Sequence, residues 1–206
     1  MTWEPVRTAY STMAGPYIDL HAGWRPDGDD AALVRRHLAG RDGAVLDLGC
    51  GPGHWTGYLH SLGVDVTGVD IVPEFLAHAE ANHPGPKFRL GSMTDLDAAD
   101  HSIAGILAWF STIHLPPPEF DRVLAELRRV LAPSGVLVAG FFDSDDDVAT
   151  FDHKVTTAYH WPVDVFSARL VRAGFTEVER LRLPSDRVDR KYAAIAARVP
   201  REATPG

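Results

Sequence analysis

The stretch 45–53, Val-Leu-Asp-Leu-Gly-Cys-Gly-Pro-Gly, constrains this chain more than any other. Its apolar start predicts a short buried strand of a parallel sheet, and its three alternate glycines predict a tight turn against a bound ligand. Residues 54–63 follow with apolar side chains at helical spacing. Strand, glycine turn and helix together form the opening unit of a doubly wound α/β sheet, in which ligands bind at the carboxyl ends of the strands.

The glycine spacing separates two classes of cofactor. Gly49, Gly51 and Gly53 give G-x-G-x-G, whereas a dinucleotide-binding turn has G-x-G-x-x-G. Asp47, just before the turn, favours a ligand with a positive charge over a pyrophosphate. The stretch resembles the first motif of class I S-adenosylmethionine-dependent methyltransferases, usually V-L-D-x-G-C-G-x-G. An NAD(P)-dependent oxidoreductase with an unusual glycine turn is the alternative.

Composition limits the other possibilities. A chain of 206 residues, 45% of them hydrophobic, is expected to form one domain around one core. Its net charge of −8 argues against a nucleic-acid partner, and the lack of an 18-residue apolar run or signal pattern predicts a soluble, cytoplasmic protein without a membrane partner. A monomer and a homodimer are both open. Cys50 is the single cysteine, and its small size in the turn explains it better than a catalytic thiol does.

Residue patterns predict the remaining elements. Arg7–Leu20 has helical character interrupted at Gly15 and Pro16, and Asp29 or Asp30 can cap a helix that ends near Leu38. Further helices are expected to begin near residues 73, 117 and 163, and further strands at 64–69, 87–90, 103–110, 136–142, 175–183 and 192–199. Residues 184–190 are expected to form a polar turn and residues 200–206 a disordered tail.

The resemblance implies a Rossmann-like three-layer α/β/α sandwich. Its seven-stranded sheet would have the order 3-2-1-4-5-7-6, with the last strand antiparallel. Residues 1–30 would form an N-terminal lid segment, residues 31–200 the methyltransferase domain and residues 201–206 the tail. Within the domain, residues 143–162 would be a substrate-cap loop.

The implied cofactor is S-adenosyl-L-methionine. Asp70 ends the second strand about 20 residues past the turn, where a carboxylate can accept hydrogen bonds from both ribose hydroxyls, as it also can in an NAD enzyme. The family usually has an acid where Ser92 stands, so the usual adenine contact is altered here. The expected cofactor-binding residues are Asp47, Gly49, Cys50, Gly51, Gly53, Trp55, Asp70, Ile71, Ser92, Met93, Thr94, Trp109 and Phe110.

The run Trp109–Leu115 resembles the fourth motif of small-molecule methyltransferases, which often ends in a histidine. His114 is therefore the candidate catalytic residue, because an imidazole can take a proton from an acceptor hydroxyl or amine at neutral pH. A structural hydrogen bond in the turn is the alternative role, and methyl transfer can also proceed by alignment alone. The N/D-P-P-Y/F motif of nucleic-acid and protein amide methyltransferases is absent from this position.

Aromatic and histidine residues on both sides of the domain predict the pocket for the methyl acceptor. Tyr17, His21, His153, Tyr159 and Trp161 are the substrate-binding candidates, and Tyr10 is a further candidate for the pocket wall. Such a cap suits a flat or partly apolar small molecule. The acidic run at 143–147 lies in a loop without a second acidic motif, so no metal is expected.

We therefore expect an enzyme that transfers a methyl group from S-adenosylmethionine to an oxygen or nitrogen atom of a small-molecule metabolite. A protein of the same fold that binds the cofactor without methylating is the second alternative, because function depends on the site and not on the fold.

Overall fold

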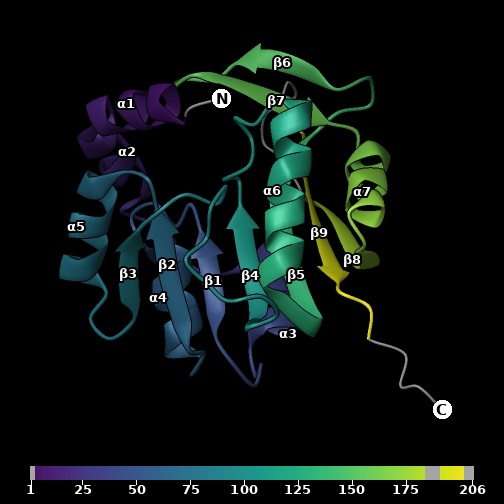
Figure 1. The fold of residues 1–206 in the computed structure, drawn as a ribbon. Helices are drawn as coiled ribbons and strands as arrows, with labels where there is room; N and C mark the ends of the chain where they lie inside the picture. The colour runs from purple at the N-terminus through teal and green to yellow at the C-terminus, as the bar shows by residue number, and fades with distance from the viewer. Residues whose placement is uncertain (1–2, 184–190, 202–206) are drawn as a thin grey trace.

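The computed structural model describes residues 3–183 and 191–201 (Figure 1). The helices are α1 (Glu4–Thr12), α2 (Ala14–His21), α3 (Gly28–Leu38), α4 (His54–Ser61), α5 (Pro73–Asn82), α6 (Pro117–Val130) and α7 (Val163–Arg172). The strands are β1 (Val45–Leu48), β2 (Val66–Asp70), β3 (Lys87–Leu90), β4 (Ile103–Trp109), β5 (Leu131–Asp143), β6 (Ala149–Asp152), β7 (Thr157–Trp161), β8 (Thr176–Leu183) and β9 (Lys191–Arg198).

The sheet has the topology that the sequence predicted. Strands β3, β2, β1, β4 and β5 are neighbours in this order and run parallel. Strand β9 pairs antiparallel with β5 along its length, from Val136↔Arg198 to Asp143↔Lys191, and β8 pairs with β9. With β8 and β9 as the sixth and seventh strands, the order 3-2-1-4-5-7-6 with an antiparallel last strand is confirmed.

Two further strands lie where the sequence predicted a loop. Within residues 143–162, β6 and β7 form an antiparallel hairpin. Strand β7 also pairs in parallel with the end of β5, where Phe142 lies opposite His160. The reason is the residue content, because β-branched and aromatic side chains favour strands and pair across them, as Thr150 and Tyr159 do. The hairpin lies above the carboxyl ends of the parallel strands, on the same side as α1 (Figure 1).

The N-terminal segment also differs from its expected form. The helical stretch breaks at Met13 and not at Gly15 and Pro16, so that α1 and α2 are two short helices. Pro16 lies in the first turn of α2, where the missing amide proton of proline removes no intrahelical hydrogen bond. The expected turn at 184–190 and most of the expected tail lie outside the described residues.

The core has two sides, as a three-layer fold requires. Successive side chains of a strand point to opposite faces: Leu46 of β1 belongs to the apolar cluster with α6 and α7, and Val45 belongs to the cluster with α3 and α4. Helix α6 buries an apolar stripe consisting of Phe120, Val123, Leu124, Leu127 and Val130. In the described part of the chain, every helix is too short or too polar to cross a membrane.

Candidate active site

The glycine turn connects β1 to α4 at the carboxyl edge of the sheet. Gly49, Gly51 and Gly53 have φ values of 68°, 53° and 89°, a backbone region that favours glycine. A Cβ atom at Gly49 would lie 2.3 Å from the Cβ of Ser111, so the turn packs closely against the end of β4. A Cβ atom at Gly51 would meet only Tyr17, at 4.0 Å, so the chain is open to a ligand there.

The amide groups of the turn are used within the protein. The N–H groups of Gly49 and Cys50 both donate to the carbonyl of Val69, at 2.7 and 3.1 Å. The N–H of Gly51 donates to Oδ2 of Asp70 at 2.8 Å. A dinucleotide-binding turn offers its amides to a pyrophosphate. These three amides already have partners, so they do not form such a phosphate site.

Asp47 lies beneath the turn and is 1% exposed. Its Oδ2 atom accepts a hydrogen bond from the hydroxyl of Thr56 at 2.6 Å, and the backbone N–H of Thr56 also donates to the carboxyl group. Burial raises the pKa of Asp47 to about 7. The carboxyl group thus occupies the N-terminus of α4, where a pyrophosphate would otherwise bind. It supports the turn from below and lines neither cavity described next.

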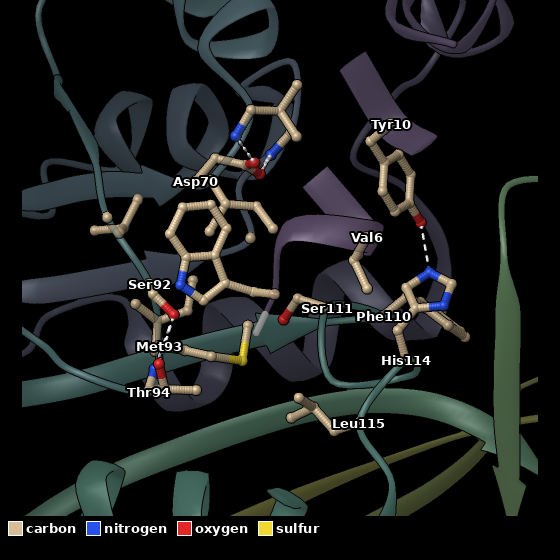
Figure 2. Close-up of a pocket in the computed structure, with 18 of the residues that line it drawn as sticks. Val6, Tyr10, Asp70, Ser92, Met93, Thr94, Phe110, Ser111, His114 and Leu115 are labelled. Carbon is tan, nitrogen blue, oxygen red and sulfur yellow. Dashed lines mark hydrogen bonds between the residues drawn. The ribbon is translucent and has the colours of Figure 1, made fainter. Parts of the chain in front are cut away.

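Asp70 ends β2 and points toward the turn (Figure 2). Its Oδ1 atom accepts the N–H of Val72 at 2.9 Å, while Oδ2 accepts the N–H of Gly51. Burial raises the pKa of Asp70 to about 6, although these backbone donors act in the opposite direction. Each carboxylate oxygen can accept a further hydrogen bond, so the group fits two adjacent hydroxyls of a ribose.

A first cavity lies in front of the turn and Asp70, and it encloses about 1060 Å³ of empty space including the part open to solvent. Ile71 and Met93 give it apolar walls, and Ser111 contributes a buried Oγ atom without a hydrogen-bond partner among the described residues. A ribose acceptor, apolar walls and an unsatisfied hydroxyl are the groups that a nucleoside bearing an amino-acid chain requires. The residues present therefore fit S-adenosylmethionine.

Ser92, the residue that stands in place of the family's usual acid, lies on the wall of this cavity. Its Oγ atom is 2.8 Å from Oγ1 of Thr94 and accepts the N–H of Thr94 at 3.2 Å (Figure 2). The hydroxyl therefore stabilises the local turn and carries no charge toward the cavity.

A second cavity adjoins the first. Both are lined by Tyr10, Tyr17, Gly49, Gly51, Trp109 and Phe110. Phe110 has a φ of 53°, an uncommon conformation for a residue with a side chain. Its ring makes edge contacts with Phe142 and Tyr192, at centroid distances of 5.2 and 5.5 Å. The wall of the second cavity is therefore aromatic next to the junction of the two cavities.

His114 lines the first cavity next to Tyr10 and is held on both ring nitrogens. The carbonyl of Thr157, which lies 2.8 Å from Nδ1, can only accept a hydrogen bond, so Nδ1 carries the proton. In the neutral ring Nε2 then accepts the hydroxyl of Tyr10 at 2.9 Å (Figure 2). Burial lowers the pKa of His114 and raises the pKa of Tyr10 above its usual range. Both side chains are therefore neutral near pH 7.

The structure brings most of the candidate residues together. The first cavity is lined by Tyr17, Gly49, Gly51, Asp70, Ile71, Ser92, Met93, Thr94, Trp109, Phe110 and His114. The second is also lined by His21, Cys50, Trp55 and His153. Burial raises the pKa of the Cys50 thiol well above its usual range, so the thiol is a poor nucleophile.

Three candidates besides Asp47 lie elsewhere. Gly53 faces α5 and β3, because a Cβ atom there would meet Ala79 at 2.8 Å. Trp161 is 2% exposed and packs on Phe120 in the core, at 5.1 Å between ring centroids. Tyr159 donates its N–H to the carbonyl of Ile113 and lines neither cavity. The hairpin explains the last two positions, because strand pairing fixes which way each side chain points.

Several residues of the first cavity have no counterpart among the predicted site residues. They are Trp3, Val6, Leu48, Val69, Val72, Phe75, Gly91, Ser111, Leu115, Pro116 and Glu119. Trp3 and Val6 come from the start of α1 or just before it, far from the motifs in sequence. Ser111 had one available signal, since it directly follows the expected fourth strand.

Known proteins resemble this chain in the same region. Residues 45–135 match a family described as a methyltransferase domain. The malonyl-[acyl-carrier protein] O-methyltransferase of Pectobacterium atrosepticum is 32% identical over 134 residues, which make up 65% of this chain and 51% of that protein. The chain spans about half to three fifths of the length of such curated relatives.

Solved structures share the whole fold. The 1,6-didemethyltoxoflavin-N1-methyltransferase of Burkholderia thailandensis, described with bound 1,6-didemethyltoxoflavin and S-adenosylhomocysteine, is 24% identical, with a TM-score of 0.81 over 96% of this chain and 88% of that one. The [4+2]-cyclase SpnF is 18% identical, with a TM-score of 0.79 over 95% of this chain and 96% of that one. At these identities the likeness concerns the fold alone. Residues 45–135 therefore resemble a methyltransferase domain, and the whole chain has the fold of these S-adenosylmethionine-dependent methyltransferase structures.

Proposed function

We propose that the protein binds S-adenosylmethionine in the first cavity and transfers its methyl group to an oxygen or nitrogen atom of a planar small molecule in the second. One observation carries the choice of cofactor. The turn amides of Gly49, Cys50 and Gly51 have partners within the protein, and two buried carboxyl groups, Asp47 and Asp70, lie at the turn. This environment suits a cationic donor and opposes a pyrophosphate.

Different residues would bind the ribose, the adenine and the amino-acid end of the donor. Asp70 would accept the two ribose hydroxyls, Ile71 and Met93 would flank the adenine, and the turn at Gly49 and Gly51 would hold the amino-acid end. When bound, the sulfonium supplies an electrophilic methyl group. The contribution of the protein is then to align that methyl group with the acceptor atom at the junction of the two cavities, which can supply a large part of the acceleration.

The lining of the second cavity supports the acceptor class. Trp109, Phe110, Phe142 and Tyr192 present ring faces and edges to it, a surface that suits a flat molecule. Charged side chains also belong to its lining, and Arg25, Asp27, Asp29 and Lys154 among them are exposed. The similar N1-methyltransferase is described with bound 1,6-didemethyltoxoflavin, which is also a planar molecule.

Calorimetric titration tests the donor. We expect micromolar binding of S-adenosylmethionine and S-adenosylhomocysteine but not of NAD, and an affinity loss of at least about 100-fold in Asp70→Ala, because two charge-assisted hydrogen bonds are removed. Asp97→Ala is the matched control, since Asp97 is 95% exposed, pairs with Arg89 and lines neither cavity. Circular dichroism checks that each variant is folded.

Methyl transfer is tested next with isotopically labelled donor and three planar probes: 1,6-didemethyltoxoflavin, catechol and 4-nitrocatechol. Labelled product from at least one probe is expected. Binding of NAD in place of the sulfonium donor would contradict the choice of cofactor. Donor binding without turnover on any probe would contradict methylation of this acceptor class and favour a binding protein or a non-methylating enzyme of the same fold.

A further inference from the structure

We propose that Tyr10 is the group that takes the proton of the acceptor and that it passes a proton on to His114. This inference rests on the proposed function and names its proton path. It also restricts the acceptors to molecules whose nucleophilic oxygen or nitrogen carries a hydrogen atom at working pH. His114 is then the final proton acceptor and Tyr10 the catalytic residue that touches the substrate.

The hydrogen bonds of His114 exclude direct contact between its base nitrogen and the acceptor. Nδ1–H donates to the carbonyl of Thr157 at 2.8 Å, and the lone pair of Nε2 is occupied by the hydroxyl of Tyr10 at 2.9 Å. A neutral imidazole has only these two in-plane hydrogen-bonding positions. An acceptor can therefore deliver its proton to His114 only through Tyr10 in this arrangement.

Tyr10 is in the right place to meet both substrates. Its side chain lines both cavities, so it lies where the donor and the acceptor would approach one another. Its phenolic oxygen uses its hydrogen atom toward His114 and keeps acceptor capacity for one more group. The ring is held by edge contacts with Tyr17, Phe75 and His114, at centroid distances of 5.6, 6.0 and 5.5 Å.

Burial keeps both members neutral before the reaction, because it lowers the pKa of His114 and raises the pKa of Tyr10. Tyr17 and Asp70 lie near Tyr10, and with burial they hold its phenol in the protonated form. The ring of His153 lies 5.4 Å from the ring of His114. Glu119 of α6 lines the first cavity together with His114. A neutral phenol that donates to a neutral imidazole can accept one proton while releasing another.

The reaction balances without any further reactant. The acceptor atom forms a bond to the methyl carbon, and the carbon–sulfur bond breaks with its electron pair remaining on sulfur. The proton of the acceptor moves to the oxygen of Tyr10 as the phenolic proton moves to Nε2 of His114. The products are the methylated acceptor, a neutral thioether and an imidazolium, which returns its proton to water.

The test compares Tyr10→Phe with wild type and with Tyr58→Phe, a matched control because Tyr58 lies on α4 and lines neither of the two cavities. The acceptors are catechol, which is protonated at pH 8, and 4-nitrocatechol, whose nitro group makes it largely ionised there. For 1,6-didemethyltoxoflavin the rates are compared below and above the pKa of its ring N–H. Affinity for S-adenosylhomocysteine is measured for every variant.

We expect Tyr10→Phe to lower kcat by about 100-fold for acceptors that are protonated. Acceptors that are already ionised should lose less than about threefold, because they have no proton to give. Affinity for S-adenosylhomocysteine should stay within about twofold, and Tyr58→Phe should match wild type throughout.

An equal loss for protonated and ionised acceptors, or no loss for either, would overturn the relay while leaving methyl transfer in place. A wild type that binds S-adenosylhomocysteine but methylates none of the probes would instead overturn the proposed function. The two failures are therefore distinguishable.

Discussion

Two buried carboxyl groups decide what the site can bind at the scale of single residues. Asp47 and Asp70 are 1% and 6% exposed, the charge of Asp70 adds to burial in raising the pKa of Asp47, and both charges add to burial in raising the pKa of the Cys50 thiol. Asp47 is satisfied by Thr56, and Asp70 by the amides of Gly51 and Val72. A cationic ligand with hydroxyl groups offsets both the charge and the remaining hydrogen-bonding capacity.

The affinity for S-adenosylhomocysteine should depend on pH through Asp70. Its pKa is raised to about 6, and only the ionised carboxylate accepts hydrogen bonds from both ribose hydroxyls. We expect a constant dissociation constant above about pH 7 and a loss of about tenfold per pH unit below pH 6. Titration of wild type and Asp70→Asn from pH 5 to 8 checks this. The same slope in both proteins would assign the dependence to another group, with Asp47 the nearest buried acid.

Asp47→Asn should change stability in a pH-dependent way. The folded protein keeps a proton on Asp47 up to about pH 7, whereas the unfolded chain loses it near its ordinary pKa of 3.8. The free energy of unfolding of wild type therefore falls as pH rises through this window. Relative to wild type, the variant should gain about 2 to 3 kcal/mol between pH 5 and pH 8. Urea denaturation at both pH values measures it, and a constant difference would mean that Asp47 is ionised throughout.

At the scale of elements, helix α1 and the β6–β7 hairpin, which do not belong to the parallel strands or to the helices that connect them, complete the site. Helix α1 has no buried residue, yet Val6 and Tyr10 line the first cavity from it. The β6–β7 hairpin supplies the start of the β7 strand, whose Thr157 carbonyl fixes the tautomer of His114. Both elements lie above the carboxyl ends of the strands (Figure 1). The carboxyl edge of the sheet therefore forms one side of the first cavity, α1 lines another side, and the hairpin positions His114.

Removal of residues 1–12 should separate binding from folding. Because α1 has no fully buried residue but packs the half-buried Tyr10 on Phe75, we expect the melting temperature without ligand to fall by no more than about 4 °C. Affinity for S-adenosylhomocysteine should fall by about tenfold, since one wall of the first cavity is lost. Calorimetry and thermal unfolding measure the two effects. Arg7→Ala is the control, because it removes only exposed contacts with Glu4 and Trp3. Unchanged affinity after truncation would show that α1 does not contact the ligand.

At the scale of the whole molecule, the first cavity joins segments that are distant in sequence. Residues of α1, of the turn after β1, of the end of β2 and of the loop after β4 all line it. A ligand that contacts all of them binds the folded state and not the unfolded chain. Occupation of the cavity should therefore stabilise the whole fold.

Thermal unfolding with S-adenosylhomocysteine measures this coupling. At a ligand concentration about 100 times the dissociation constant, the stabilisation should be about 2.7 kcal/mol, which corresponds to about 5 to 10 °C for a chain of this size. NAD at the same concentration should give no shift, and Asp70→Ala with S-adenosylhomocysteine should shift by no more than about 2 °C. An equal shift with NAD would contradict the cofactor assignment.

The donor half of the site could be predicted from sequence because its residues are local to motifs. The strand, turn and helix of residues 45–63 and the acid at Asp70 are tied to backbone geometry that short sequence patterns encode. Apolar periodicity indicated the strands and helices, and the resemblance to the methyltransferase family implied the order of the strands in the sheet. Gly49 and Asp70 were thus identified before any contact was known.

The acceptor half depended on tertiary structure. Tyr10 meets His114 across 104 positions of sequence, and no local pattern encodes such a pairing. Tyr159 and Trp161, chosen as aromatics of a loop, are instead oriented by strand pairing in a hairpin, which buries Trp161 in the core. The sequence by itself indicated the fold class and the residues proposed for the donor site, through local periodicity, the glycine turn and the family resemblance that these motifs carry. Only the packing of distant segments decided which side chains share the second cavity and which nitrogen of His114 carries the proton.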